Sequence, residues 1–212
     1  MKTKMITLAL AFLVTSLFAD ETAYMTSMTK SIAQVYNAQT TDELQQAVNT
    51  FVRIGNAEKT KWEPFYYEAF GYIMMANRED DVAKKDAFLD QAKVAVDKAT
   101  TIRPNDSEIV ALEGFISMIR VTVDPATRGM QYSGAAMQSF SKAVFLNPEN
   151  PRALALLAQM QLGTAKFFKA SPDEACATNV KALEKFAAAK SENPLAPSWG
   201  KGMAEGLQSQ CK

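Results

Sequence analysis

Histidine is absent from this sequence of 212 residues. Its absence removes the commonest general base, the Ser-His and Cys-His nucleophile pairs, and the imidazole ligands of metal sites. The sequence also lacks the GxSxG, P-loop, HExxH and GxGxxG patterns. These absences argue against a classical hydrolase or a zinc enzyme, and the sequence predicts no cofactor and no metal site.

Neither sign of charge is in excess, because 23 Lys and Arg balance 23 Asp and Glu. No overall basic field is therefore present to hold a nucleic-acid backbone. Nine glycines and eight prolines are too few for a disordered linker. A content of 48% hydrophobic and 22% charged residues is instead typical of a packed globular protein.

A long hydrophobic run occurs once, at the amino terminus. Two lysines precede an apolar stretch from Met5 to Phe18, and Ala19 ends it before a polar pair. This pattern predicts a signal peptide over residues 1–19, and its length makes a membrane anchor the weaker alternative. We expect residues 20–212 to form one exported domain, periplasmic or secreted, with no stable membrane insertion after cleavage.

The main positive signal is a repeat with a long period. Three segments share the frame Ala-x3-apolar-x2-Ala-x4-Pro, and a fourth, degenerate copy lacks the proline. The copies are Ala92, Val96, Ala99, Pro104; Ala136, Phe140, Ala143, Pro148; Ala182, Phe186, Ala189, Pro194; and Ala47, Phe51, Ile54. Their first alanines lie 44 to 46 residues apart, so the repeat spans most of the chain.

Each copy of the frame predicts a helix. Positions 0, 4 and 7 share one helical face, small alanines allow close approach of a neighbour, and proline ends the helix. Another apolar stretch with helical periodicity precedes each copy, and no window shows the alternation of a β-strand. The repeating unit is therefore a pair of antiparallel helices that buries its apolar face by stacking on its neighbours.

This frame resembles the tetratricopeptide repeat, whose second helix ends in the same spacing. The resemblance covers about residues 41–210, and Phe70-Gly71 and Leu157-Ala158 stand where that family has its Leu-Gly pair. It implies an all-α, right-handed solenoid of antiparallel helix pairs. The chain is similar to small exported tetratricopeptide-like proteins of Gram-negative bacteria.

The chain departs from the family in two ways. In the middle repeat Glu113-Gly114 follows Leu112, which leaves the register of that first helix open by one residue, and the period is 44 to 46 residues rather than 34. We place the extra residues in longer helices and in two loops, Asn77–Asp86 and Thr122–Ser133; the second loop is a candidate recognition element. The end of the chain, from Pro197 through Met203 to Cys211, predicts the capping helix that such arrays need.

The resemblance also implies a concave groove lined by the first helix of each pair. Carried over position by position, the candidate ligand-binding residues are Phe65, Tyr72, Met75, Phe115, Met118, Arg152 and Gln159. Aromatic and Met side chains beside single charges suit an extended peptide or a partner helix. The alternative is that these apolar side chains belong to the core.

The sequence thus favours a non-enzymatic exported module that binds a protein or peptide partner and no nucleic acid. Two alternatives stay open: an enzyme with a carboxylate or lysine site in an inter-helix cleft, and a structural accessory of an envelope complex. Eleven methionines are better explained by core filling than by soft-metal binding.

Two cysteines, Cys176 and Cys211, permit one disulfide in an exported chain. Cys176 lies 14 residues before Lys190, where the last repeat's second helix is expected to end, and Cys211 lies 14 residues after Pro197. In an antiparallel helical hairpin, 14 residues extend about 21 Å along each helix, so Cys176 and Cys211 are expected at the same height along the two helix axes. We expect a disulfide that fastens the terminal cap; two free thiols are the alternative.

Overall fold

The computed structural model describes residues 21–191 and 193–211, and the described residues form helices and no strands. The predicted signal peptide lies outside this range. The first described helix covers residues 21–37. It is followed by α2 (Thr41–Ala57), α3 (Glu63–Arg78), α4 (Val82–Ile102), α5 (Ser107–Val123), α6 (Pro125–Leu146), α7 (Pro151–Phe168), α8 (Asp173–Ala188) and α9 (Lys201–Gln208).

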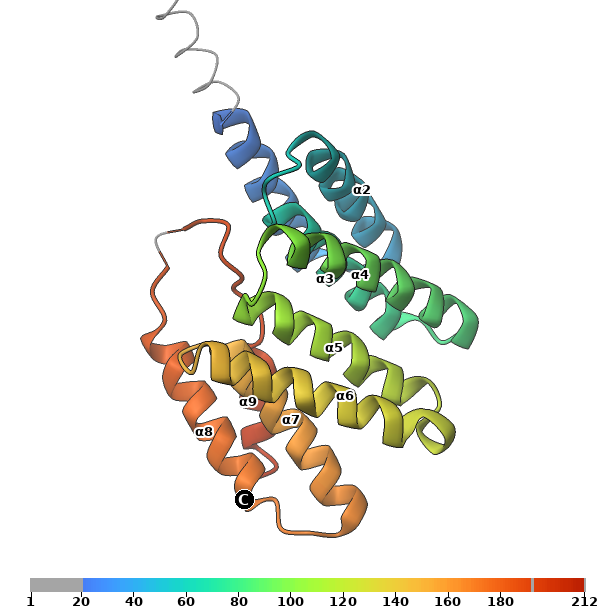
Figure 1. Ribbon diagram of the computed structural model, residues 1–212, viewed down its shortest axis with the longest axis vertical. Coiled ribbons are helices and arrows are strands. Elements are labelled where there is room, and N and C mark those ends of the chain that lie inside the picture. The colour runs from blue at the N-terminus through green and yellow to red at the C-terminus, as the bar shows by residue number, and fades with distance from the viewer. Residues whose placement is uncertain (1–20, 192, 212) are drawn as a thin grey trace, which may run out of the picture.

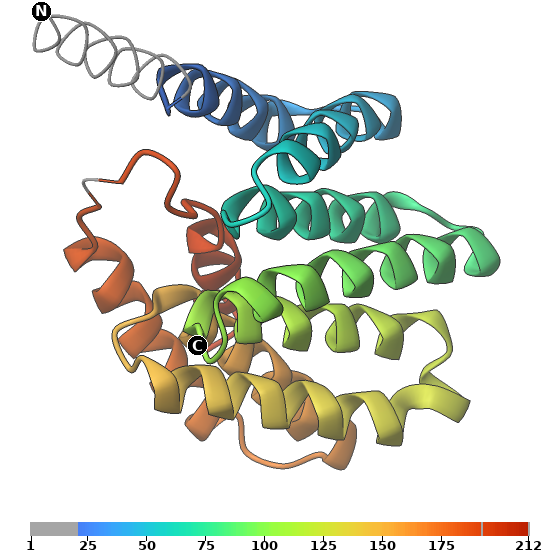
Figure 2. The same cartoon turned by 45° about the horizontal axis from the view of Figure 1, so that its top comes forward.

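The helices form antiparallel pairs that stack in chain order, as Figures 1 and 2 show. The helix over residues 21–37 precedes α2, and the following pairs are α3–α4, α5–α6 and α7–α8. The first helices α3, α5 and α7 contact one another along the stack, and α9 packs on α7 and α8 as the final element. The expected helical solenoid with a C-terminal capping helix is confirmed.

Polar side chains set where most helices begin. The Thr40 hydroxyl accepts a hydrogen bond from the Glu43 amide, and the Glu43 carboxylate accepts one from the Thr40 amide. Asp106 and Asn150 cap α5 and α7 in a similar way, each accepting two backbone N–H groups. Because the first N–H groups of a helix have no partner inside it, these caps fix the starts of the helices.

The repeated frame forms the contact between the helices of a pair. Ala136, Phe140 and Ala143 are fully buried on α6. A methyl group built on Gly114 of α5 would lie 2.5 Å from Phe140 Cε1, so α5 and α6 approach too closely for a larger side chain. The last copy departs from this pattern, because α8 ends at Ala188 and leaves Ala189 exposed.

The two expected loops are wrong. Only residues 79–81 separate α3 from α4, and only Asp124 separates α5 from α6. Pro125 suits the first turn of α6, and the Asp124 carboxylate accepts a hydrogen bond from the Thr127 amide, so the helix starts at once. Most of the extra residues of the long period therefore lie in long helices.

The start of α6 is also held from outside. Arg128, expected in a loop, is helical, and its guanidinium pairs with Asp86 of α4 at 2.7 Å. Arg120 of α5 pairs with the same carboxylate at 3.0 Å. The Thr122–Ser133 segment is thus part of the rigid stack.

A disulfide joins Cys176 of α8 to Cys211, directly after α9, with the Cα atoms 5.7 Å apart. This is the pairing that the sequence predicts. It ties the capping helix to the last pair of the array, and the buried Asn179 side chain adds a hydrogen bond of 2.9 Å to the Ala204 carbonyl.

Candidate functional site

The concave face carries a chain of polar contacts between successive first helices. The Tyr66 hydroxyl on α3 faces Glu108 of α5, with 3.4 Å between Tyr66 Oη and Glu108 Oε2. The same carboxylate pairs with Arg152 of α7, at 2.8 Å from Nε to Oε2 and 2.6 Å from Nη2 to Oε1. Two parallel N–H···O bonds make a strong, directional pair.

Electrostatics keep the Tyr66 phenol neutral. Burial raises its pKa well above the ordinary value, and the negative charge of Glu108 raises it further. The pKa of Tyr67 is raised by burial as well. Both hydroxyls can therefore donate one hydrogen bond and accept another.

The segment over residues 193–200, here called the arm, returns from α8 towards α3 along the concave face (Figure 2). Its Trp199 indole stacks between two phenylalanines, with ring centroids 5.1 Å from Phe70 of α3 and 5.6 Å from Phe115 of α5. The indole N–H donates a hydrogen bond of 3.0 Å to the Tyr66 hydroxyl. The chain thus covers part of its own groove.

Two further hydrogen bonds hold the arm. The Tyr67 hydroxyl donates to the Leu195 carbonyl at 2.9 Å, and the Ser198 amide donates to the Tyr36 hydroxyl at 3.2 Å. Leu195 and Pro197 are buried. The arm is therefore attached to the helix over residues 21–37 and to α3 by side-chain contacts rather than by regular structure.

Four of the predicted groove residues lie on α5 and α7. Phe115 lies on the concave face, but Trp199 covers it. Arg152 is held by Glu108, and the hydrogen bonds and charge of that carboxylate outweigh burial and raise the pKa of the guanidinium. Met118 and Gln159 are half-buried.

The predicted groove positions on α3 are wrong. Phe65 packs against Gly55 of α2, and Tyr72 stacks on Phe88 of α4 with centroids 6.5 Å apart. Met75 is fully buried in the core. All three therefore contact neighbouring helices or the core and do not line the groove.

These positions are wrong because Gly71 of α3 was aligned with Gly114 of α5 as the small residue of the first helix. Gly71 packs against Val48 of α2, which belongs to the preceding pair, whereas Gly114 packs against Phe140 of its own pair. Taking Ala69 instead moves each position two residues towards the amino terminus. The groove positions then include Tyr66 and Phe70, which do meet Glu108 and Trp199.

Sequence reasoning missed Phe70 and Trp199 as groove residues. The density of aromatic residues between Trp62 and Tyr72 was the available signal for α3. The repeat frame ends at Pro194, so nothing in the periodicity indicated that the arm turns back.

Half-buried methionines continue the concave face beyond the stacked rings. Met74 and Met118 follow Phe70 and Phe115 by four and three residues, so each lies one helical turn further on the same face. Met203 lies four residues after Trp199, on α9. These thioethers extend an apolar surface next to the indole.

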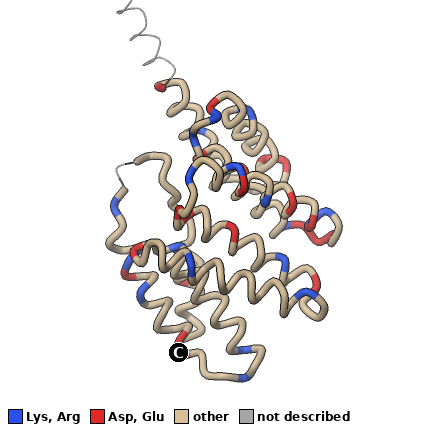
Figure 3. The backbone as a smooth tube through the Cα atoms, in the orientation of Figure 1, with Lys and Arg blue, Asp and Glu red and all other residues tan. Residues whose placement is uncertain are grey.

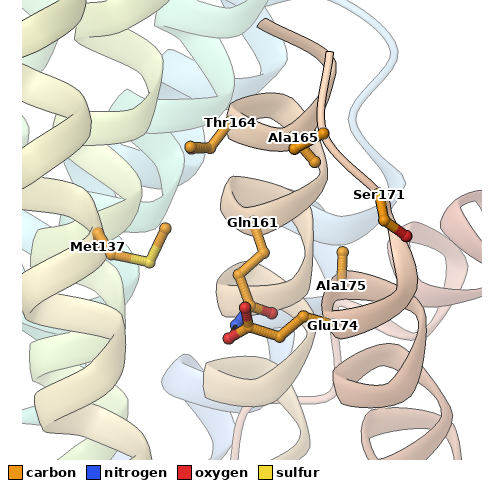
Figure 4. A pocket seen from close by; sticks show the side chains of 8 residues that line it. Met137, Gln161, Thr164, Ala165, Ser171, Glu174 and Ala175 are labelled. Carbon is orange, nitrogen blue, oxygen red and sulfur yellow. Dashed lines mark hydrogen bonds between the residues drawn. The ribbon is translucent and has the colours of Figure 1, made fainter. Parts of the chain in front are cut away.

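Two partly open hollows lie among the described residues. One, of about 240 Å³, lies between α6, α7 and α8 and is lined by Met137, Gln161 and Glu174 (Figure 4). Another, of about 230 Å³, lies beside Tyr24 and Arg53. Pockets for organic ligands usually measure about 300–1,000 Å³. Both of these hollows are smaller than that range.

Charges of both signs are interspersed along the chain (Figure 3). Glu68 is the buried carboxyl among the described residues, so the described part shows no cluster of buried acids in one cleft. Over the same part, no group of three or more Cys, Asp or Glu residues is placed to hold a metal ion. No described helix is both long and apolar enough to cross a bilayer.

No model of a known protein family matches the chain, and no curated protein matches it either. Among solved structures it is similar to the HusA haemophore from Porphyromonas gingivalis, with a TM-score of 0.80 and 28% identity over 89% of this chain and 92% of that one. It also resembles TTC0263, a thermophilic tetratricopeptide-repeat protein of Thermus thermophilus, with a TM-score of 0.55 and 18% identity over 82% and 88% of the two chains. The second similarity concerns the fold alone.

Proposed function

We propose that this chain is an exported carrier of haem or a related tetrapyrrole, which it binds on the concave face. The observation that carries the proposal is the similarity to a haemophore over 89% of this chain, at 28% identity and a TM-score of 0.80.

The chemistry of the concave face suits a flat, largely apolar ring. Phe70, Trp199 and Phe115 already form a stack of near-parallel rings, and Met74 and Met118 lie one helical turn away. Ring faces stack at such distances, and polarizable thioethers adapt to a planar ligand.

The residues present favour binding through the macrocycle over binding through the iron. Histidine is absent, and both cysteines are in the disulfide. Burial raises the pKa of Tyr66 and Tyr67, which disfavours a phenolate ligand. The Tyr36 hydroxyl is engaged with Tyr67 and the Ser198 amide, and methionine is the other common axial ligand at this face. Iron-free protoporphyrin should therefore bind about as well as haemin.

Export completes the proposal. The pattern over residues 1–19 directs the chain out of the cytoplasm, and a disulfide is stable in the periplasm or outside the cell. We place the protein in the envelope of a Gram-negative bacterium or in its surroundings. In this role it is a carrier rather than an enzyme.

A protein partner is the second candidate, and one observation favours it. Phe167 and Phe168, at the end of α7, are 80% and 71% exposed and form an edge-to-face pair with centroids 5.0 Å apart. Exposed aromatic pairs of this kind are typical of protein interfaces. The predicted peptide groove is less favoured, because Phe65, Tyr72 and Met75 contact neighbouring helices or the core instead of lining it.

Haemin titration followed by absorbance tests the carrier function. We expect a saturable spectral change with the wild-type protein, and weaker binding by Phe115→Ala with retained helical circular dichroism. The matched control is Phe145→Ala, which removes an 86% exposed ring from α6 and should bind as the wild type does. Absence of saturable binding by the wild type, or equal loss in both variants, would count against the proposal.

A further inference from the structure

Trp199 occupies a slot whose walls are the rings of Phe70 and Phe115. The indole plane makes angles of 28° and 22° with those rings, so all three planes are nearly parallel. Both walls are almost fully buried, while the indole is only half-buried. The walls belong to the helix stack, and the indole belongs to the arm.

The contacts of the indole are those of any flat aromatic ring with a polar edge. Two stacked faces hold the ring, and one hydrogen bond joins its N–H to the Tyr66 hydroxyl. The Tyr66 hydroxyl directs its one proton towards Glu108, so at the position of the indole N–H it offers an acceptor that another polar N–H or O–H group could use. Nothing in the slot is specific for tryptophan.

We propose that the slot between Phe70 and Phe115 is the seat of the cargo's ring and that Trp199 fills it until the cargo displaces it. This inference rests on the proposed carrier function and adds to it the position of the ring and the residue that competes for that position.

The attachment of the arm is compatible with such an exchange. Beyond the stack, the arm is held by the hydrogen bonds from Tyr67 and to Tyr36 and by the buried side chains of Leu195 and Pro197. The exchange requires that Trp199 leaves the slot, not that the whole arm detaches. The far end of the arm is Gly200, whose φ of 101° lies in the region that favours glycine. The following helix α9 is tied to α8 by the disulfide, so the indole can leave the slot while the cap stays in place.

Because Trp199 competes with the cargo for the slot, the apparent affinity for the cargo is the intrinsic affinity multiplied by the fraction of molecules whose slot is free. Trp199→Ala empties the slot and should tighten haemin binding by about tenfold or more. Tyr67→Phe removes the hydrogen bond to Leu195, together with the 3.5 Å contact to the Tyr36 hydroxyl, and should tighten haemin binding by a smaller factor. Phe145→Ala, on the outer face of α6, should leave the affinity unchanged. The tighter binding expected for Trp199→Ala and Tyr67→Phe is opposite in sign to the weaker binding expected for Phe115→Ala.

A spectroscopic experiment follows the indole directly. The chain has two tryptophans, so a 15N spectrum contains two indole N–H signals, and Trp62→Phe assigns them. Gallium protoporphyrin, which is diamagnetic, should move the Trp199 signal to the position of a solvent-exposed indole. An unchanged Trp199 signal at saturation would overturn the inference and leave the carrier function intact.

Free indole tests the slot without a porphyrin. We expect indole to raise the melting temperature of Trp199→Ala and to leave that of the wild type unchanged, because only the variant has a vacant slot. If neither protein binds haemin, the carrier function fails, and stabilisation by indole still shows that the slot accepts a planar ring. Weaker haemin binding by Trp199→Ala, or no response of that variant to indole, contradicts the exchange.

Discussion

Glu108 and Arg152 occupy corresponding positions in successive repeats, 44 residues apart, and their side chains form a nearly buried ion pair at 2.6 Å. The pair joins α5 to α7, and Tyr66 extends it to α3. The repeat period therefore brings Glu108 and Arg152 together, whereas Tyr66 lies 42 residues before Glu108 and joins them from a position outside the repeated one.

Removing one partner of this pair should be costly. Arg152→Met leaves the Glu108 carboxylate almost buried without its counter-charge, and we expect the free energy of unfolding to fall by about 3 kcal/mol. The double variant Glu108→Gln with Arg152→Met should be less destabilised, because no unpaired charge remains. Urea denaturation measures both effects.

An exposed ion pair provides the control. Lys185→Met removes a partner of Glu149, whose side chain is 68% exposed, and should cost less than about 1 kcal/mol. Equal losses for Arg152→Met and Lys185→Met would show that the concave pair contributes no more than a surface contact.

The contact between α5 and α6 predicts a large effect of one methyl group. A Cβ atom on Gly114 would lie 2.5 Å from Phe140 Cε1, so Gly114→Ala should lower the stability by about 1–3 kcal/mol. Gly134→Ala on α6, where no atom lies within 4 Å, should instead raise it by up to about 1 kcal/mol. Thermal unfolding of both variants checks the difference, and a stabilised Gly114→Ala would contradict the packing.

The helix pairs, their order and the disulfide could be predicted from the sequence because each leaves a periodic or pairwise signal. The alanines and Phe140 repeat every 44 to 46 residues and are buried at the contact between helices. Cys176 and Cys211 could be paired because they are the two cysteines of the sequence and an exported chain favours a disulfide, although α9 is shorter than the helix assumed for it.

The candidate site was harder to predict, for two physical reasons. Two small residues of α3, Ala69 and Gly71, can each be aligned with Gly114 as the position of close contact between helices. Choosing Gly71 shifts every predicted groove position on α3 by two residues. The arm is irregular and contacts residues more than 100 positions away, such as Tyr67, so no local pattern reports where it lies.

Glu68 predicts a pH dependence of stability. Its carboxyl is 4% exposed, and burial raises its pKa, although the charge of Lys98 partly opposes the rise. Because the folded state holds the Glu68 proton more tightly than the unfolded state does, this carboxyl contributes stability that is fully present below the ordinary Glu pKa of about 4.3. That contribution to the free energy of unfolding is lost as the pH rises through the folded-state pKa. Each unit of the rise corresponds to about 1.4 kcal/mol.

Glu68→Gln mimics the protonated carboxyl and should remove this dependence. We expect the variant to match the wild type near pH 4 and to be more stable than the wild type at pH 8. Chemical denaturation at both values measures the difference. A variant less stable than the wild type at pH 8 would mean that the ionised carboxylate stabilises the fold.

The disulfide should stabilise the capping helix. It closes a loop of 35 residues, for which the chain-entropy model gives about 3–4 kcal/mol. Replacing both cysteines with serine should lower the stability by about that amount, and the denatured, unreduced mature protein should contain no free thiol. Two free thiols per chain would exclude the bond, and a dimer that dissociates on reduction would indicate bridges between chains.

The central claim is that a tetrapyrrole lies on the concave face, and methionine methyl groups report it most directly. Titration of protein labelled at the methionine methyl carbons with gallium protoporphyrin should produce large ring-current shifts at Met74, Met118 and Met203. Met130, 93% exposed on α6 and away from that face, should not move. Shifts confined to Met130, or no shifts at saturating porphyrin, would contradict the account.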